Sequence, residues 1–500
     1  MTSKIEDYAL IGDLQTCALV ARDGSVDWMC VPRFDSPACF AALLGTPEHG
    51  RWKLAPREPI ESVQRRYRGD SLILETTFTT SSGSVRIIDF MPIRSAAIDL
   101  IRIVEGIEGR VPMRMDFALR FDYGSIVPWV RATEHGIRAI AGPDTVHLRA
   151  DVPLHGEDFT TVSEFEIGPG ERVTFDLTWT ESHHPQPPRE NAFEALGELE
   201  QFWHEWSSRC TYEGPWRDAV MRSLITLKAL TYSPTGGIVA AATTSLPERI
   251  GGVRNWDYRL CWLRDATFSI YALLGGGYTE EAIAWREWLV RVAAGLPEEL
   301  QIMYSIRGER HLTELEIEWL PGYENSKPVR VGNAAYKQYQ LDVYGEVMDV
   351  LHLTRKLDLP PSEDAWRVQR ALMRFLERGW KEPDEGIWEV RGPRRHFTHS
   401  KVMAWVAFDR AVAAVEKFAL DGPVERWREI RDEIRAEILE KGFRSDVQAF
   451  VQFYGSSDTD ASLLMLPALG FIDADDPRML GTIALIRKQL ESGGLLRRYL

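Results

Sequence analysis

Two aromatic-rich loops carry the charged residues best suited to acid–base chemistry and to binding hydroxyl groups. The first loop begins at Arg254, contains Trp256 and Trp262, and ends on the adjacent pair Arg264 and Asp265. That pair presents hydrogen-bond donors and acceptors side by side, and an indole adds a flat apolar face. These residues therefore suit a ligand with neighbouring hydroxyl groups. The alternative is that Asp265 only caps a helix and pairs with Arg264.

The second loop runs from Asp384 to Gly392 and places Glu389 directly after Trp388 and two residues before Arg391. Burial beside an indole disfavours the ionised form of a carboxylic acid, which raises its pKa and suits it to donate a proton. Glu389 fits that description. The alternative is a surface loop in which Glu389 pairs with Arg391, and the local pattern alone favours this alternative.

Two further groups of polar residues have weaker patterns. The acidic segment from Glu314 to Asn325 could hold a cation or supply a second carboxylate, although acidic runs are usually solvated. Within this segment, Tyr323 is a further candidate to contact the ligand. The other group precedes or begins a predicted helix. Its members could bind hydroxyl groups or cap that helix: His396, His399 and Lys401.

Alternating patterns rich in Ile, Val, Phe and Thr predict β-strands in the N-terminal third of the chain. The turn signal Asp23-Gly24 indicates further strands before them. Regularly spaced strands of this kind predict an antiparallel β-sandwich. The clearest predicted strands are Ser71 to Thr80, Ser84 to Ile93, Leu100 to Ile107, Met113 to Phe121 and Val173 to Thr180.

The segment from Ser182 to Pro188 breaks both periodicities and is expected to be a linker. His183 and His184 are potential metal ligands, but no third ligand is evident nearby, so a solvated linker is favoured and no metal is predicted. The expected domains are a β-sandwich over residues 1–188, a linker helix over 189–212 and a helical domain over 213–500.

The helical periodicity of the remaining sequence predicts helical hairpins arranged as a toroid, with the polar loops gathered at one end. Apart from the linker helix over 190–208, nine helices are predicted, so one helix lacks a partner and the ring is expected to be incomplete at its C-terminal end. The predicted helices are Glu190 to Ser208, Pro215 to Tyr232, Asp265 to Leu274, Thr279 to Ala294, Ala334 to Leu357, Glu363 to Trp380, Ser400 to Phe418, Pro423 to Lys441, Asp458 to Leu469 and Pro477 to Leu490.

Composition excludes several classes of function. The 500 residues carry a net charge of −15, which disfavours nucleic acid as a partner. The sequence shows neither a long apolar run nor a basic, apolar start, so no membrane association is expected and a cytoplasmic location is favoured. The 5 cysteines include no close pair, which predicts reduced and mostly buried thiols.

Five segments together resemble glycoside hydrolase family 15, which comprises glucoamylases, glucodextranases and certain bacterial trehalases. Trp262-Leu263-Arg264-Asp265 is similar to the family's aromatic-x-Arg-Asp signature, and Gly386-Ile387-Trp388-Glu389 to its general-acid loop. The resemblance also covers the segments Ile5 to Tyr8 and Gly24 to Trp28, which resemble the N-terminal domain of bacterial members, and Gly322 to Asn333, which resembles an insertion in their barrel.

The resemblance implies an (α/α)6 barrel in which Arg264 and Asp265 bind the terminal glucose and Glu389 is the acid. The family's base belongs to a Glu-bearing motif followed by a Gly-Asn-Phe-Pro-Gln-like stretch, which is not found in these 500 residues. The implied activity is inverting, exo-acting hydrolysis of maltodextrins or trehalose with release of β-glucose, weakened by the missing base, and without a cofactor. A phosphate-dependent disaccharide phosphorylase and an impaired glycan-binding fragment are the alternatives. Oligomeric state is left open.

Overall fold

The computed structural model describes residues 3–95, 97–295 and 299–500, which divide into two units. The expected domain boundaries after residues 188 and 212 stay predictions, and both fall inside unit 1. Unit 1 comprises Met1–Leu260, Gly275–Tyr278 and Thr313–Asn333, and unit 2 comprises Cys261–Leu274, Thr279–Leu312 and Ala334–Leu500.

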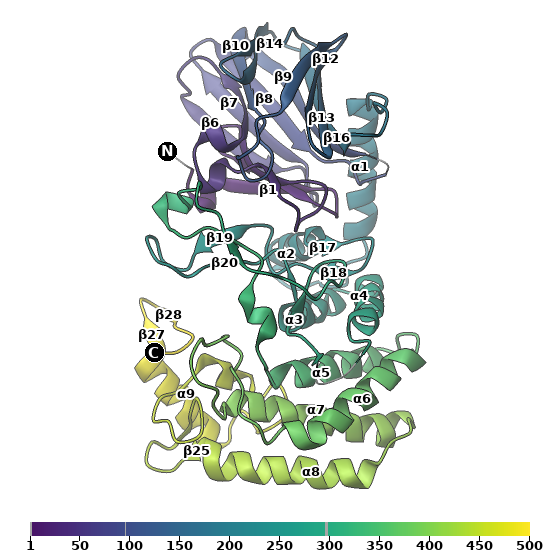
Figure 1. Cartoon of the computed structure of the whole chain (residues 1–500), viewed down its shortest axis with the longest axis vertical. Helices are drawn as coiled ribbons and strands as arrows, with labels where there is room; N and C mark the ends of the chain where they lie inside the picture. The colour runs from purple at the N-terminus through teal and green to yellow at the C-terminus, as the bar shows by residue number, and fades with distance from the viewer. Residues whose placement is uncertain (1–2, 96, 296–298) are drawn as a thin grey trace. The chain divides into compact units, whose positions relative to one another are not determined.

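Two antiparallel sheets form the sandwich of unit 1 (Figure 1). The first sheet has the order β1 (Tyr8–Gly12), β2 (Cys17–Ala21), β3 (Ser25–Cys30), β5 (Arg51–Pro56), β10 (Val111–Ala118), β15 (Thr160–Ile167) and β14 (His155–Glu157), with β4 (Ala38–Phe40) paired to β3. The second sheet has the order β11 (Trp129–Thr133), β12 (Gly136–Ala141), β13 (Asp144–Ala150), β16 (Arg172–Glu181), β9 (Ile98–Gly109), β8 (Gly83–Phe90), β7 (Leu74–Thr80) and β6 (Ser62–Tyr67).

Strict alternation of side chains explains why these segments form a sandwich. In β10, Val111, Met113, Met115 and Phe117 are buried in the core, whereas Arg114 lies on the opposite face with its neighbours Pro112 and Asp116. The same core contains side chains of the second sheet. The five strands predicted most clearly correspond to β7, β8, β9, β10 and β16, so the predicted antiparallel sandwich is confirmed.

A buried guanidinium joins the two sheets. Arg102, on β9, is fully buried and donates to both carboxylate oxygens of Asp89, on β8, at 2.7 and 3.3 Å. It also donates to the carbonyls of Trp52, on β5, at 3.0 Å and of Gly24 at 2.8 Å. Because β5 belongs to the first sheet, Arg102 satisfies backbone groups of one sheet and a carboxylate of the other.

The segment predicted as a linker is attached to the sandwich. Arg149, on β13, donates to the carbonyls of Pro187 at 2.5 Å and of Pro188 at 3.4 Å. Helix α1 (Ala192–Ser207) then begins after Asn191, whose side chain accepts from the N–H of Phe193 at 3.1 Å. The predicted helix from 190 to 208 is therefore present, with an N-cap that local sequence supplies.

Unit 1 also contains α2 and short strand pairs, and unit 2 is mainly helical. The short strands of unit 1 are β17 (Thr231–Tyr232), β18 (Gly237–Ile238), β19 (Thr244–Pro247), β20 (Asn255–Asp257), β23 (Leu315–Glu316) and β24 (Arg330–Val331). The helices after α1 are α2 (Arg217–Ala229), α3 (Leu263–Gly275), α4 (Thr279–Val292), α5 (Asp342–Lys356), α6 (Glu363–Gly379), α7 (Thr398–Phe418), α8 (Val424–Glu437) and α9 (Pro477–Leu490). The short strands of unit 2 are β21 (Cys261–Trp262), β22 (Met303–Tyr304), β25 (Phe443–Arg444), β26 (Ala449–Phe450), β27 (Glu491–Ser492) and β28 (Leu495–Leu496).

Helix α7 packs against both α5 and α8, and the three lie side by side in Figure 1. The approach of α5 to α7 depends on Gly345, because a Cβ at that position would lie 2.3 Å from the carbonyl oxygen of Met403. Fifteen of the α7 side chains, including Trp405, are buried. This nearly all-round burial makes α7 the central helix of the group.

One predicted helix is wrong and another is shorter than expected. Residues 458–469 contain only a 3₁₀ segment, Ala461–Met465. Pro467 lacks the N–H that an α-helix needs, and the side chain of Asp460 instead accepts from the N–H of Ser462 at 2.8 Å. The helix predicted to begin at Ala334 begins at Asp342, after a separate 3₁₀ turn over Ala334–Lys337.

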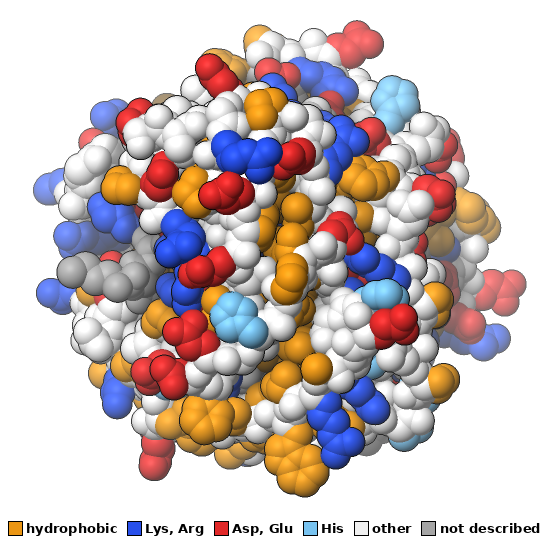
Figure 2. Space-filling view, turned by 90° about the horizontal axis from the view of Figure 1, so that it is seen from above, with side chains coloured by type: hydrophobic (Ala, Val, Ile, Leu, Met, Phe, Trp, Pro, Cys, Tyr) orange, Lys and Arg blue, Asp and Glu red, His pale blue; other side chains and the backbone are white. Residues whose placement is uncertain are grey.

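The surface and the cysteines agree with the composition. Figure 2 shows basic and acidic side chains interspersed, together with hydrophobic ones, across the face that it presents. All 5 cysteines are free thiols and, apart from Cys210, they are buried, as predicted. Among the helices in the described residues, none combines the length and the apolar character needed to span a bilayer.

Substitution of Arg102 should strongly destabilise the protein, because its guanidinium joins the two sheets. Arg102→Met leaves the Asp89 carboxylate buried without its partner, which should lower the free energy of unfolding by about 3–5 kcal/mol. Arg110→Gln is the matched control, because Arg110 and Glu171 form an exposed ion pair of the same sandwich at 3.1 Å, worth about 0–1 kcal/mol. Urea denaturation of the full chain measures both variants, and equal losses would contradict the bridging role.

Candidate active site

The first predicted loop reaches helix α3 through a short strand pair. In the β21–β22 pair, Trp262 lies opposite Met303, and the N–H of Leu263 donates to the carbonyl of Ile302 at 2.9 Å. Helix α3 begins at Leu263, so Arg264 and Asp265 lie in its first turn. The strand pair therefore positions the Trp262 indole, and the helix start positions the two charged residues.

The second predicted loop, between α6 and α7, has a backbone conformation that few residues adopt. Gly386 has a φ of 71°, and a Cβ there would lie 2.7 Å from the Phe397 ring, so the position requires glycine. Glu389 has a φ of 55° although it is not glycine. A left-handed non-glycine residue costs about 1–3 kcal/mol and is found preferentially at functional sites.

Hydrogen bonds hold this strained loop in place. The Arg264 guanidinium donates to the carbonyl of Ile387 at 2.5 Å, and the side-chain amide of Gln338 donates to the carbonyl of Glu389 at 3.3 Å. The N–H of Glu389 donates to the carbonyl of Gly386 at 3.2 Å. The first loop, through Arg264, therefore helps to set the backbone of the second.

The side chains of the two loops meet at the carboxyl group of Glu389. Its Oε1 accepts a hydrogen bond from Nε1 of Trp262 at 2.7 Å and lies 3.6 Å from a guanidinium nitrogen of Arg264. The same nitrogen is 2.9 Å from Oδ2 of Asp265. The structure thus brings together four predicted residues, Trp262, Arg264, Asp265 and Glu389, within unit 2.

The pKa of Glu389 is raised above its ordinary value, as the sequence predicted. Burial is the largest cause, and the nearby charge of Asp265 adds to it. The charge of Arg264 and the hydrogen bond from Trp262 act in the opposite direction. These two neighbours on the first loop therefore limit the rise in the pKa of the Glu389 carboxyl.

Sequence analysis missed two acids of α5 that belong to the same electrostatic environment. Asp342 and Glu346 are buried one helical turn apart. Burial raises the pKa of Asp342 to about 6 and that of Glu346 well above its usual range. Both oxygens of Asp342 lack a hydrogen-bond partner among the described residues. The signal that could have revealed them is the spacing of acids at i, i+4 and i+7 along one face of a predicted helix, at Asp342, Glu346 and Asp349.

Four carboxyl groups surround Arg264. Burial by itself lowers the pKa of Arg264, but the charges of Asp265, Glu389, Asp342 and Glu346 together raise it above the ordinary value. The guanidinium therefore stays charged. His399, which the sequence placed among possible hydroxyl ligands, is buried and its pKa falls to about 4 through burial and the charge of Arg264, so its imidazole is neutral at neutral pH.

The indole of Trp388 is fixed by a residue that sequence analysis also missed. Its Nε1 lies 2.9 Å from both carboxylate oxygens of Asp460. Asp460 also accepts from the side-chain amide of Gln452 at 3.0 Å and from the hydroxyl of Ser462 at 2.6 Å. The Trp388 N–H is thus directed at Asp460, and the indole N–H that reaches Glu389 is that of Trp262.

Three other residues were predicted to contact a ligand, and they lie elsewhere in the structure. Trp256, in unit 1, lies under the Arg330 guanidinium at 4.6 Å. Tyr323, also in unit 1, is buried and its hydroxyl accepts from the N–H of Ile5 at 3.1 Å. Arg391 is exposed in the second loop. The predicted contacts of these three side chains with a ligand stay predictions.

Two weaker groups from the sequence have structural roles. In the acidic segment, Glu314 and Glu316 form ion pairs with Arg330 at 3.6 and 3.2 Å. Lys401 is buried, and its ammonium donates to the carbonyls of Trp380 and, at 2.8 Å, of Glu382. The His396 ring stacks on Tyr454 at 5.8 Å.

Comparison with known proteins adds evidence independent of this geometry. Residues 214–499 match the model of the glycosyl hydrolases of family 15, and residues 1–164 match the trehalase-like N-terminal domain. The chain is 37% identical to a trehalase of Mycobacterium tuberculosis, covering 99% of this chain and 77% of that relative. It is 35% identical to a trehalase of Thermoplasma volcanium, covering 99% and 80%.

A solved structure is similar over nearly the whole chain. A bacterial glucoamylase complexed with acarbose superimposes with a TM-score of 0.69 and 13% sequence identity, over 98% of this chain and 79% of that chain. At this identity the similarity concerns the fold. It agrees with the expected combination of an antiparallel sandwich and an (α/α)6-type helical domain.

The two indoles near the acid predict different effects on its titration. Trp262→Phe removes the N–H that favours the ionised carboxylate, so the pKa of Glu389 should rise further. Trp388→Phe is the matched control, because its N–H is bound to Asp460, and it should leave that pKa nearly unchanged. Titration of ¹³C-labelled glutamate carboxyls by NMR measures both, with Glu389→Gln identifying the resonance. Equal effects of the two substitutions would contradict the assigned hydrogen bond.

Proposed function

Because the chain belongs to the glycosyl hydrolases of family 15, we propose that it is an inverting hydrolase of α-linked glucosides with Glu389 as its general acid. One observation supports this most strongly: the Glu389 side chain is only 20% exposed, its pKa is raised, and Trp262 donates a hydrogen bond to it at 2.7 Å. A carboxylic acid that retains its proton toward neutral pH can deliver it to a leaving oxygen.

In the proposed step, the proton of Glu389 passes to the glycosidic oxygen while the bond from that oxygen to C1 breaks. Glu389 is left as a carboxylate. The Trp262 N–H and the Arg264 charge, 3.6 Å away, favour this ionised form and so stabilise the product of proton transfer. A water molecule attacks C1 from the opposite face, which inverts the anomeric configuration. The attacking water releases one proton to the solvent, and the Glu389 carboxylate takes a proton back from the solvent.

We assign Arg264 and Asp265 to the hydroxyl groups of the terminal glucose. Their ion pair at 2.9 Å offers remaining N–H donors and carboxylate lone pairs, and the Asp265 side chain is 41% exposed, so it can reach a ligand. Trp388 would supply an apolar face, since its N–H is already bound to Asp460. The same roles would apply to any substrate with a terminal α-glucose.

Trehalose is the proposed substrate. The relatives that support it are named trehalases and share 33–37% identity with 99% of this chain in the examples from Mycobacterium tuberculosis, Thermoplasma volcanium and Sulfolobus acidocaldarius. Maltodextrins are the second candidate, because a glucoamylase has the same fold. Both substrates would place an α-glucose beside Arg264 and Asp265, so the distinction lies with the second sugar.

Inversion also requires a base about 6.5–9.5 Å from the acid, and we assign no residue to it. The Glu-bearing motif expected for the base was not found in the sequence. Loss of general-base help typically lowers the rate by about 10²–10⁴. We therefore expect slow hydrolysis by these 500 residues, and the proposed acid has to be tested by binding as well as by turnover.

Glu389→Gln should reduce kcat for trehalose by about 10²–10⁴, because the amide cannot donate the proton. The affinity for acarbose, measured by calorimetry, should change only a few-fold. Glu382→Gln, at an exposed residue between α6 and the loop that carries Glu389, should leave both quantities unchanged. Unchanged turnover by Glu389→Gln would remove Glu389 from the mechanism, and acarbose binding without turnover by the unmodified chain would favour a glycan-binding role.

The anomers released from trehalose test the stereochemistry. Inverting hydrolysis should yield equal amounts of β-glucose, from the attacked ring, and α-glucose, from the leaving ring, when ¹H NMR spectra are recorded before mutarotation. A retaining enzyme would release only the α anomer. With phosphate present, free glucose should remain the product, whereas glucose 1-phosphate formed only with phosphate would indicate the phosphorylase alternative.

A further inference from the structure

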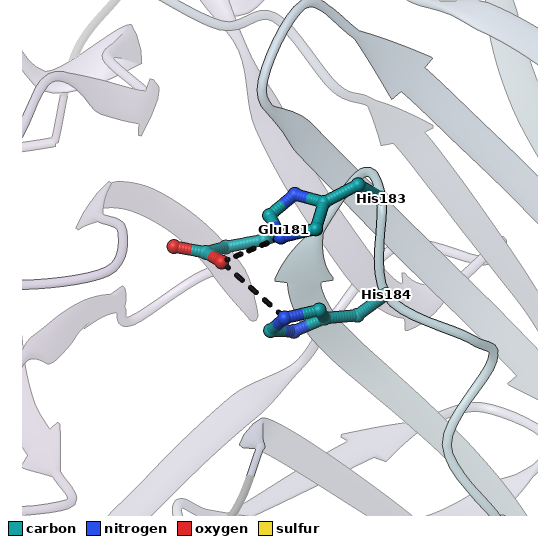
Figure 3. Close-up of side chains that lie close together, drawn as sticks. All are labelled: Glu181, His183 and His184. Atoms are coloured by element: carbon teal, nitrogen blue, oxygen red, sulfur yellow. Dashed lines mark ion pairs between the residues drawn. The ribbon is translucent and has the colours of Figure 1, made fainter.

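Three potential metal ligands gather at the end of the second sheet of the sandwich. Glu181 is the last residue of β16, and His183 and His184 follow in the turn after it (Figure 3). The sequence singled out the two histidines and found no third ligand. That expectation is wrong, because the structure brings the Glu181 carboxylate to both imidazoles.

The distances in this cluster suit a shared ion better than hydrogen bonds. Oε2 of Glu181 lies 3.5 Å from Nε2 of His183 and 3.6 Å from Nε2 of His184. An N–H···O hydrogen bond is shorter, at about 2.7–3.2 Å. Two ligands of a tetrahedral ion with bonds of about 2.0–2.1 Å lie roughly 3.4 Å apart. One donor atom from each residue lies within 4.8 Å of the others, so modest side-chain rotations would bring all three to one ion.

The backbone around the cluster is held independently of any ion. The N–H of His184 donates to the carbonyl of Glu181 at 3.0 Å, which closes the turn, and the N–H of Ser182 donates to Pro143 at 2.7 Å. Glu181 is paired with Asp144 in the β13–β16 ladder. Because the strand end and the turn are both fixed, the three side chains need only small rotations to converge.

We propose that Glu181, His183 and His184 form a binding site for a transition-metal ion of the Zn²⁺, Ni²⁺ or Cu²⁺ type. Two imidazoles and one carboxylate match the ligand preference of these ions, whereas Mg²⁺ and Ca²⁺ prefer all-oxygen sites. All three side chains are more than half exposed, so water can complete the coordination. The ion joins the end of β16 to the segment leading to Pro187 and Pro188, and this role is independent of the proposed hydrolysis.

Calorimetric titration of the full chain, without a histidine tag, with ZnCl₂ tests the site. The unmodified protein should bind one Zn²⁺ that His183→Asn, His184→Asn and Glu181→Gln each weaken at least about tenfold, since even loss of an outer-sphere partner typically costs ~10–100-fold. His155→Asn, an exposed histidine of β14 in the same sandwich, should bind Zn²⁺ as the unmodified protein does. MgCl₂ should give no saturable heat.

Equal Zn²⁺ affinity in the unmodified protein and in either histidine variant would overturn the proposal, as would an unchanged affinity in Glu181→Gln. A second readout is the electron paramagnetic resonance spectrum with one equivalent of Cu²⁺. It should show coupling to two imidazole nitrogens, reduced to one in each single histidine variant. A spectrum that the substitutions do not alter would also overturn it. Circular dichroism verifies that each variant is folded.

Discussion

The arrangement of the proposed active site depends on the guanidinium of Arg264. One nitrogen of this side chain lies between Asp265, at 2.9 Å, and Glu389, at 3.6 Å, and another binds the carbonyl of Ile387 at 2.5 Å. A planar guanidinium suits this task because it offers several donors in a rigid fork. Without it, the strained loop would lose its link to α3, and two carboxyl groups would lose their shared countercharge.

Three of the four acids around this cation have raised pKa values, and burial is the largest cause for each. Asp265, Glu389, Asp342 and Glu346 all act on Arg264, yet a single positive charge cannot compensate four carboxylates in a poorly solvated interior. The pKa of Glu389 is raised by burial and by the charge of Asp265, while the charge of Arg264 and the hydrogen bond from Trp262 lower it.

Local sequence patterns correctly predicted features that depend on residues close together in the chain. The strands of the sandwich follow from alternation, and Trp262, Arg264, Asp265 and Glu389 were found from short segments whose residue types suit one chemistry. The α-helix predicted over 458–469 does not form, although the periodicity favours it, because Pro467 cannot donate a backbone hydrogen bond. The third residue of the His183 and His184 cluster was missed because a strand end and a turn place Glu181 beside them.

The sequence by itself determined the fold class, the family resemblance and the identity of the proposed acid, because these depend on residue types at short spacing. Only the tertiary structure decided which groups surround that acid. Trp262 and Glu389 are far apart in the chain, yet the indole N–H lies 2.7 Å from the carboxyl. The buried acids of α5 and the Asp460 partner of Trp388 likewise come from distant segments. Burial and through-space charge set a pKa, and neither is a property of a residue's neighbours in sequence.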